Sequence, residues 1–319
     1  MLELNNIHEM ALRIKSNISE VIIGNEETID LLLVAIISGG HILLEDVPGT
    51  GKTLLAKTLA RSIDCDFKRV QFTPDLLPSD ISGINFYSQK TGDFEFRPGP
   101  LFANIVLADE INRATPRTQS SLLEAMEERQ VSVDGETRHL DRPFLVIATQ
   151  NPVENQGTFP LPEAQLDRFL LKIGMGYPKT EDSIALLRRF KETQPLESIL
   201  PVASKADLMA ASKVFTTVHV SDDLLRYLVE IAEKTRSHPE LLLGVSPRGT
   251  QAMLRAIQAL AVIRGRSYVI PDDIKKLAKP VFAHRMLARS RVRGQNDGVL
   301  NILDKIIADT PVPAEVGIV

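Results

Sequence analysis

The chain has 319 residues, of which 44% are hydrophobic, one is cysteine and none is tryptophan. Its length suggests about two domains, and 37 basic against 41 acidic residues argue against a surface that grips nucleic acid throughout. An internal disulfide is excluded, no apolar run approaches the roughly 18 residues of a membrane span, and the first residues lack a signal peptide's apolar centre, so a soluble cytoplasmic protein is expected.

The first part of the chain, residues 1–177, alternates strand-like and helix-like segments. Several short runs are apolar without alternation, which is typical of strands covered on both faces. The predicted strands are residues 41–45, 67–72, 104–109, 144–150 and 169–175. Amphipathic segments at 52–63 and 117–130 predict helices between them. The alternation indicates a parallel sheet with helices on both faces, built from right-handed crossovers.

Two segments interrupt this alternation. Residues 79–98 are polar and rich in turn formers, and they predict a hairpin-like insertion before the third strand. Residues 131–140 contain Asp134 followed by Gly135, which is a favoured two-residue hairpin turn. From these patterns alone, surface decoration and a functional role remain equally open.

The second part, residues 178–319, follows a joint at Tyr177 and Pro178. Apolar residues at three- and four-residue spacing predict a small all-helical domain. The predicted helical segments are 208–214, 222–232, 247–264, 272–284 and 299–308. Ser246 followed by Pro247 indicates a helix start, because serine caps the first turn and proline suits its first position.

The strongest chemical signal follows the first predicted strand. EDVPGTGKT, residues 45–53, leaves a strand and opens a helix, which is the context of a phosphate-binding loop. Its backbone amides can surround phosphate oxygens; they belong to Gly49, Thr50 and Gly51. Lys52 adds a positive charge for the β- and γ-phosphates, and the hydroxyl of Thr53 is placed for Mg²⁺. Asp46 stands where the general pattern has glycine, but the later glycines form the cradle, so binding is expected to survive.

Polar side chains end two other predicted strands. Ligands of open α/β sheets bind beyond the carboxyl ends of strands. Asp109 can therefore hold Mg²⁺ through its water shell, and Glu110 can orient and deprotonate the attacking water. Asn151 can bridge that water and the γ-phosphate. A solvated loop or a plain turn is the alternative for each, and the pairing of the acids with the loop favours nucleotide chemistry.

Two arginines are further candidates. Arg168 precedes the last predicted strand, at the sheet edge opposite the loop, and is interpreted as a finger that completes a neighbouring subunit's site. A salt bridge with Glu163 or Asp167 is the alternative. Arg248 opens a helix of the second part, where the helix dipole disfavours a cation, so it needs a compensating anion. A γ-phosphate would serve and would couple domain closure to the nucleotide, whereas a nearby carboxylate is the alternative.

Together these motifs resemble an AAA+ ATPase, and longer blocks resemble the MoxR family more narrowly. The blocks are QFTPDLLPSDISG (71–83), FRPGPLFANIVLADEINRATPRTQSSLLEAMEE (96–128) and ATQNPVENQGTFPLPEAQLDRF (148–169). They cover most of residues 20–177, and the similarity continues more loosely through the helical part. The departure at Asp46 also occurs in MoxR-like sequences.

The resemblance implies a fold, a reaction and a set of roles. The fold is a P-loop AAA+ parallel sheet flanked by helices, followed by a small all-α lid domain, and the reaction is Mg²⁺-dependent hydrolysis of ATP to ADP and phosphate. By similarity, the Walker A loop is Gly49 to Thr53 with Pro48 and Leu54 beside it, the Walker B pair is Asp109 and Glu110, sensor 1 is Asn151, the arginine finger is Arg168 and sensor 2 is Arg248. Thr53 and Asp109 would hold Mg²⁺. Ile22, Ile23 and Gly24 would lie against adenine.

The resemblance also implies an assembly and a task. Residues 79–98 look like the family's helix 2 insert and 131–140 like its pre-sensor 1 hairpin, both commonly facing the pore of a ring. A homo-oligomer, most simply a hexamer, is implied, with chaperone-like remodelling or maturation of a protein client. A protein with a von Willebrand factor A domain is the implied partner, and no stable nucleic-acid binding is expected.

Two other functions remain open. A DNA-associated motor would use the basic stretch at 284–294, with its arginines Arg285, Arg289, Arg291 and Arg293, although a charge run is more often a solvated face. Only 5% of the residues are aromatic, which weighs against base stacking. A nucleotide-gated scaffold without much turnover is less favoured, because the acids and the asparagine of a hydrolase are present.

Overall fold

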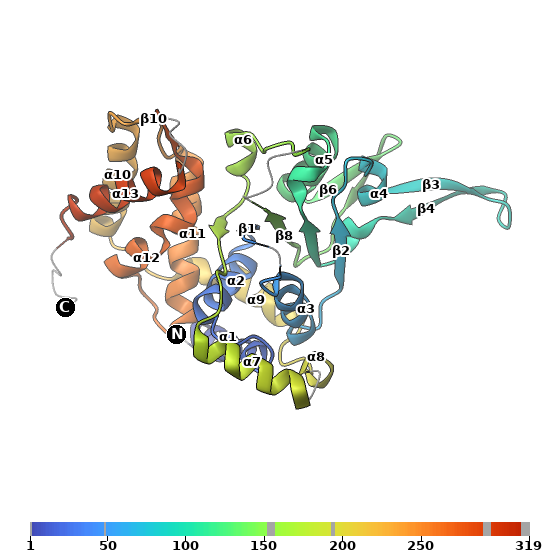
Figure 1. Ribbon diagram of the computed structural model, residues 1–319, viewed down its shortest axis with the longest axis horizontal. Coiled ribbons are helices and arrows are strands. Elements are labelled where there is room, and N and C mark those ends of the chain that lie inside the picture. The colour runs from blue at the N-terminus through green and yellow to red at the C-terminus, as the bar shows by residue number, and fades with distance from the viewer. Residues whose placement is uncertain (1, 48, 152–156, 193–194, 290–294, 314–319) are drawn as a thin grey trace.

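The computed structural model describes residues 2–47, 49–151, 157–192, 195–289 and 295–313. At its centre lies a parallel sheet of five strands in the order β2-β5-β8-β1-β9 (Figure 1). The strands are β1 (Ile42–Glu45), β2 (Phe67–Gln71), β5 (Ile105–Asp109), β8 (Leu145–Gln150) and β9 (Leu171–Ile173). Each coincides with one of the five predicted strands, so the predicted parallel sheet is confirmed.

Helices cover both faces of this sheet because its strands are apolar on both sides. Ile105 and Leu107 of β5 pack in one hydrophobic cluster with α1, α2 and α3, whereas Val106 and Ala108 pack in a second cluster with α5. Successive side chains of a strand point to opposite faces, so two covered faces require a run without polar interruption. The helices of this part are α1 (Leu2–Ser19), α2 (Glu26–Ser38), α3 (Lys52–Ser62), α4 (Pro78–Ser82), α5 (Pro116–Glu128) and α6 (Glu163–Leu166), with 3-10 turns η1 (Pro100–Phe102) and η2 (Ile111–Arg113).

Both predicted insertions are antiparallel hairpins. The first pairs β3 (Gly83–Ser88) with β4 (Asp93–Pro98) and projects from the body as a long arm (Figure 1). The second pairs β6 (Gln130–Val133) with β7 (Glu136–His139) through a turn whose two residues both have positive φ. The hairpins are joined by a side-chain hydrogen bond, in which Nδ2 of Asn85 donates to Oδ2 of Asp134 at 2.8 Å.

The second part is mainly helical. Its helices are α7 (Thr180–Glu192), α8 (Pro195–Ser198), α9 (Lys205–Val214), α10 (Asp222–Ser237), α11 (Pro247–Ile263), α12 (Pro271–Phe282) and α13 (Gln295–Ala308), with 3-10 turns η3 (Phe215–Thr217) and η4 (Ala283–Arg285). The predicted start of α11 is confirmed, since Oγ of Ser246 accepts from the amide of Gly249 at 3.0 Å. The sequence did not predict the short antiparallel ladder between β10 (Leu241–Leu243) and β11 (Leu287–Ala288).

The two parts share a hydrophobic core. Helices α9 and α11 both pack against α1 and α2, and their buried side chains belong to the same cluster as those of the first helices. Side chains also cross to main-chain carbonyls, because Asn17 donates to Leu200 and Ser212 donates to Ile37. The division at residue 177 stays a prediction.

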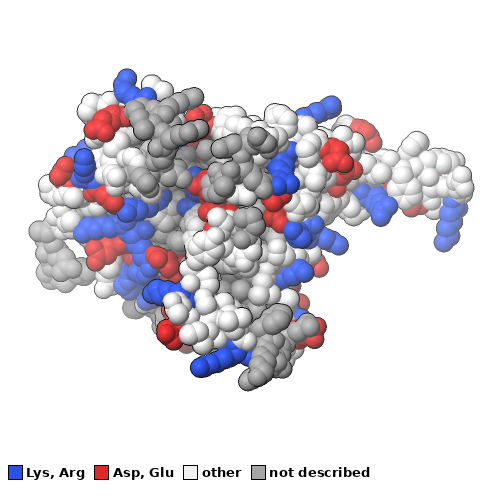
Figure 2. Space-filling model, viewed as in Figure 1, with Lys and Arg blue, Asp and Glu red and all other residues white. Residues whose placement is uncertain are grey.

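Charged side chains are mixed over the visible surface. Figure 2 shows acidic and basic residues interspersed over the body, whereas the arm is mostly uncharged. Four large apolar side chains of the arm are exposed: Ile84, Phe86, Tyr87 and Phe94. Among the helices of the described ranges, none is both long and apolar enough to cross a membrane.

Candidate functional site

A cavity of about 450 Å³ lies at the carboxyl ends of the parallel strands. The register brings the strand ends together, because Glu45 of β1 is level with Gln150 of β8, and Gln71 of β2 with Asp109 of β5. The lining residues are Asp46, Gly49, Gly51, Lys52, Thr53, Leu54, Arg69, Gln71, Asp109, Glu110, Thr149 and Asn151. The glycine-rich loop, the two acids and the asparagine, which are dispersed in sequence, therefore face one space.

The glycine-rich loop forms one wall of this cavity. Gly49 and Gly51 have φ of 85° and 90°, a left-handed conformation that favours glycine. Lys52 begins α3, and its Nζ donates to the carbonyls of Asp46 at 2.9 Å and Val47 at 3.0 Å. The ammonium group thus lies beside a helix N-terminus whose first amides have no partner within the helix. This combination of positive charges suits a phosphate group.

Asp46 has a structural role at the base of the loop. It is only 8% exposed, and its Oδ1 accepts from the amide of Val47 at 2.8 Å. Its Oδ2 accepts from the amides of Met175 and Gly176, both at 3.1 Å. Since glycine in this position has no carboxylate, the departure from the general pattern ties the loop to the segment that follows β9.

Asp109 is held by two neighbouring strands. Its Oδ1 accepts from the hydroxyl of Thr149 at 2.6 Å. Its Oδ2 accepts from Nε of Arg69 at 3.1 Å and from Nη2 at 2.6 Å. Arg69 lies on β2, and sequence reasoning missed it. Both carboxylate oxygens of Asp109 therefore have hydrogen-bond donors, and one of the donors is a guanidinium.

Glu110 is held in the same way. Its Oε2 accepts from Nε2 of Gln71 at 2.7 Å and pairs with Nε of Arg113 at 3.1 Å. Its φ of 56° is in the left-handed region, which is uncommon for residues other than glycine and occurs often at functional sites. Its amide donates to the hydroxyl of Thr149 at 2.8 Å, which fixes this backbone turn.

Arg69 and Gln71 were detectable in principle. They are two residues apart on β2, so their side chains point to the same face of the sheet. Two polar side chains at this spacing on a strand can indicate a functional site. Here they indicate one only once β2 is known to pair with β5, the strand that ends in Asp109. The sequence does not give that order directly.

The oxygen donors present fit a magnesium ion. Thr53 and Asp109 both line the cavity beside the phosphate loop. Within the ranges that the structure describes, no group of three or more His, Cys, Asp or Glu side chains forms a closed metal cage. Mg²⁺ is usually bound by one or two carboxylates together with substrate phosphates and water. These donors therefore match an ion that arrives with a phosphate ligand.

Other predicted contacts lie partly outside the cavity. Asn151 is 8% exposed and lines it, whereas Pro48 lies outside the described residues. Ile22, Ile23 and Gly24 do not line it; a Cβ on Gly24 would lie 2.3 Å from Oδ2 of Asp182 in α7. The side chain of Asp182 therefore lies directly beside Gly24, and the contact of residues 22–24 with adenine stays a prediction.

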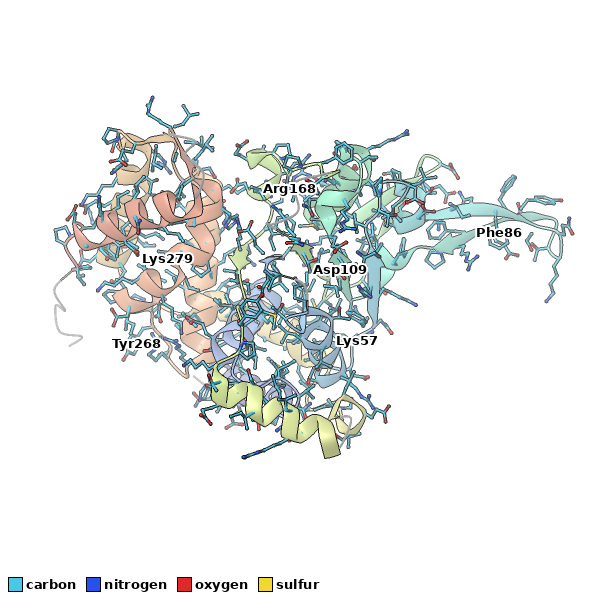
Figure 3. The ribbon with its side chains drawn as sticks, viewed as in Figure 1. Lys57, Phe86, Asp109, Arg168, Tyr268 and Lys279 are labelled. Carbon is cyan, nitrogen blue, oxygen red and sulfur yellow. The ribbon has the colours of Figure 1, made fainter. Side chains whose placement is uncertain are left out.

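Arg168 and Arg248 meet on one carboxylate away from the cavity. Nε of Arg168 lies 2.9 Å from Oε2 of Glu127, and Nη1 of Arg248 lies 2.9 Å from Oε1 of the same residue. Figure 3 shows Arg168 beside α6 and apart from Asp109. Arg168 is therefore in a salt bridge, as its alternative interpretation had it, but with Glu127, whereas Asp167 pairs with Arg285.

The contact of Arg248 with a γ-phosphate stays a prediction. In this structure Arg248 does not line the cavity. The cause is the way α11 docks: the helix packs against α1 and α2, and its capping Ser246 donates to Oδ2 of Asp167 at 3.3 Å. The first turn of α11 is thereby held beside Arg168, and the compensating anion is Glu127.

The basic stretch is not a continuous exposed surface. Arg285 is 4% exposed, its Nε donates to Oδ1 of Asp167 at 2.6 Å, and burial lowers its pKa. Arg289 is exposed and donates to the carbonyl of Leu241 at 3.0 Å. Arg291 and Arg293 lie outside the described residues. The described part of this stretch contributes a structural cation to the core.

Comparison with known proteins agrees with the geometry. Residues 41–171 match the family model for the "ATPase family associated with various cellular activities (AAA)", and residues 233–301 match that for the "AAA lid domain". The chain is 42% identical over 279 residues to Chaperone MoxR1 of Mycobacterium tuberculosis, covering 85% of this chain and 74% of that protein. It is 34% identical over 322 residues to Protein MoxR of Paracoccus denitrificans, covering 92% and 94%.

Two further relatives cover nearly the whole chain. YeaC of Bacillus subtilis, an uncharacterised protein, is 48% identical over 310 residues, which is 97% of each chain. A crystal structure from Cytophaga hutchinsonii, of a protein provisionally assigned as an ATPase, has a TM-score of 0.91 at 38% identity, covering 98% of this chain and 97% of that one.

Proposed function

Because the chain belongs to the MoxR family of AAA+ ATPases, we propose that it hydrolyses ATP in the cavity beside the phosphate loop and uses this reaction for chaperone-like remodelling of a client protein. The observation that carries the proposal is the convergence of the loop, Asp109, Glu110 and Asn151 on one cavity. Residues 1–177 would form the ATP-binding core and residues 178–319 the lid.

Binding would depend on the loop and the magnesium donors. The amides of Gly49 to Gly51 and the ammonium group of Lys52 would hold the β- and γ-phosphates. Thr53 and Asp109 would hold the Mg²⁺ ion, whose charge offsets that of the phosphate oxygens. Arg69 already contacts Oδ2 of Asp109, so its positive charge would compete with that of the ion for this carboxylate.

Hydrolysis would depend on Glu110 and Asn151. Glu110 would take a proton from the attacking water, and Asn151 would orient that water against the γ-phosphate. Gln71 and Arg113 both contact Oε2 of Glu110, so the other carboxylate oxygen, Oε1, would take this proton.

Assembly would complete the site. Neither Arg168 nor Arg248 lines the cavity of its own chain, and both lie on one surface with Glu127. We place both arginines against the nucleotide of a neighbouring subunit, where they would stabilise charge in the transition state. A closed ring, most simply a hexamer, supplies every site with such a neighbour.

We infer the cellular setting from the same family membership. We place the protein in the cytoplasm, acting on a protein client together with a partner that carries a von Willebrand factor A domain. The arm would contact the client, since Ile84, Phe86, Tyr87 and Phe94 are exposed on it. A nucleic-acid motor is less favoured because Arg285, the first arginine of the basic stretch, is buried against Asp167.

A mixing experiment tests the proposed chemistry. We expect Lys52→Ala to lose ATP binding, and Glu110→Gln to bind ATP with turnover lowered by about 10²- to 10⁴-fold. Arg168→Ala subunits should turn over ATP about 10³-fold more slowly or worse, yet regain activity when mixed with Glu110→Gln subunits. Full turnover by Glu110→Gln would remove this residue as the base, and absence of rescue on mixing would remove the finger in trans.

A further inference from the structure

A second cavity, of about 210 Å³, lies where the two parts of the chain meet. It lies at the amino ends of the parallel strands, because Gly39 precedes β1 and Phe144 precedes β8. The phosphate loop lies at the opposite, carboxyl ends. Its lining residues are Ile36, Ser38, Gly39, Arg129, Arg142, Pro143, Phe144, Met209, Ser212 and Arg255. None of them takes part in the proposed reaction.

Three arginines face this cavity without an acidic partner. In the described ranges, no carboxylate lies within ion-pair distance of Arg129, Arg142 or Arg255. Burial, and then the charges of Arg142 and Arg255, lower the pKa of Arg129 to about 10. Three like charges in a half-enclosed space, one of them largely buried, form a strongly positive pocket.

Main-chain carbonyls compensate these charges only in part. Arg129 donates to the carbonyls of Gly39 and Phe144, and Nη2 of Arg255 donates to the carbonyl of Ser38 at 2.6 Å. Ser38 and Gly39 end α2, whose C-terminus carries roughly half a negative charge. This partial negative charge is small compared with the three positive charges of the guanidinium groups.

Arg142 supplies the free donors. It is exposed, and it makes no hydrogen bond or ion pair with any residue that the structure describes. A guanidinium has five N–H donors, so Arg142 keeps all of them and Arg255 keeps most. Their planar geometry matches the paired oxygens of a phosphate group.

We propose that this pocket binds a small inorganic oxyanion of the phosphate class, such as phosphate or diphosphate. The cavity is below the roughly 300 Å³ of sites that enclose larger organic ligands, so a whole nucleotide does not fit inside it. Ile36, Pro143 and Phe144 form apolar walls that exclude water and strengthen the attraction between the anion and the arginines.

Occupation would join the two parts of the chain. Arg129 and Arg142 belong to the first part, whereas Arg255 lies on α11 and Met209 and Ser212 lie on α9. An anion held by arginines from both sides replaces their mutual repulsion with attraction. The bound ion therefore stabilises the docked position of α9 and α11 against the sheet.

The test is oxyanion binding to the full chain that carries Lys52→Ala, which weakens the phosphate loop. Diphosphate is titrated by calorimetry and by thermal unfolding, with sodium chloride at matched ionic strength and with ADP in parallel. We expect diphosphate to bind this variant and to raise its unfolding temperature. Adding Arg142→Gln and Arg255→Gln should weaken diphosphate binding about tenfold or more, because two charge-assisted contacts are lost.

Matched variants keep the result interpretable. Arg142→Gln alone changes an exposed side chain without hydrogen bonds, so it should fold normally and still weaken binding; Arg226→Gln on α10 removes an exposed arginine elsewhere and should not. Three outcomes would each overturn the proposal. The Lys52→Ala protein could lose all diphosphate binding, the arginine variants could bind diphosphate as tightly as the Lys52→Ala protein does, or sodium chloride could raise the unfolding temperature as much as diphosphate does. If ADP bound more tightly than diphosphate, the proposal that the ligand is an inorganic anion would be wrong.

Discussion

Arg69 donates two hydrogen bonds to a single oxygen of Asp109, from Nε at 3.1 Å and from Nη2 at 2.6 Å. Asp109 is the carboxylate that we propose for the magnesium ion, so a guanidinium and a divalent cation would compete for that oxygen. The second oxygen stays oriented by the hydroxyl of Thr149 at 2.6 Å.

Replacing Arg69 should therefore ease magnesium binding. With Arg69→Gln, we expect half-saturation of Mg²⁺-dependent nucleotide binding at a concentration about two- to fivefold lower. The shift is modest because the Arg69 side chain is 47% exposed, and such ion pairs contribute about 0–1 kcal/mol. Fluorescence of a nucleotide analogue, titrated with Mg²⁺, measures it, and Arg117→Gln on the surface of α5 is the control. An unchanged or higher Mg²⁺ requirement would contradict the competition.

Glu127 should position the two arginines that it binds. Glu127→Gln keeps the size of the side chain but removes the charge shared by Arg168 and Arg248. We expect ATP turnover of the assembled protein to fall by about tenfold or more through misplacement of these arginines, with little change in thermal stability. Glu128→Gln, one residue along and exposed, is the matched control. If both variants turn over ATP equally, Glu127 has no positioning role.

The carboxylate of Asp46 should stabilise the fold. Asp46→Ala leaves three amide donors, those of Val47, Met175 and Gly176, without their acceptor. We expect a loss of about 1–3 kcal/mol in the free energy of unfolding, measured in urea. Asp46→Asn keeps one oxygen acceptor and should lose less, while Asp141→Ala at an exposed site should lose almost nothing. A stable Asp46→Ala protein would show that water replaces these contacts.

Stability should decline in mild acid because of buried histidines. His41 is 3% exposed; its Nδ1 accepts from the amide of Val146 at 2.9 Å, so Nε2 carries the hydrogen and donates to the carbonyl of Met126 at 3.0 Å. Burial, and then the charge of Arg129, lower the pKa of His41 well below its ordinary value, and burial does the same for His284.

Acid should lower the free energy of unfolding. Below about pH 6.5 the unfolded chain binds protons at these histidines while the folded chain does not, so stability is complete above that pH and is lost as pH falls. Each histidine contributes a slope of up to about 1.4 kcal/mol per pH unit. Urea unfolding from pH 7.5 to 5.5 measures the slope, which His41→Gln should reduce and His139→Gln, at an exposed site, should not. An identical slope in all three proteins would exclude His41 as a cause.

Local patterns predicted most of the fold and of the cavity. The apolar runs at β5 and β8 require two covered faces, and the glycines of the phosphate loop specify its conformation locally. Both features could therefore be predicted from a few neighbouring residues. Asp134 and Gly135 likewise specify their turn without help from the rest of the chain.

The rest depended on contacts between distant segments. Arg69 and Gln71 gained a meaning only when β2 paired with β5. The place of Arg248 was set by the docking of α11, and the pairing of β10 with β11 joins residues that are more than 40 positions apart in the sequence. Helical periodicity contains no information about any of these.

The contact of Asp46 with Met175 and Gly176 has a mechanical consequence. These two residues leave β9 and lead toward α7, the first helix of the second part. A shift of the phosphate loop would therefore be transmitted to the exit of the last strand by this carboxylate as well as by the pairing of β1 with β9. Shortening the side chain at position 46 would leave the strand pairing as the remaining connection between the loop and the segment that leads to α7.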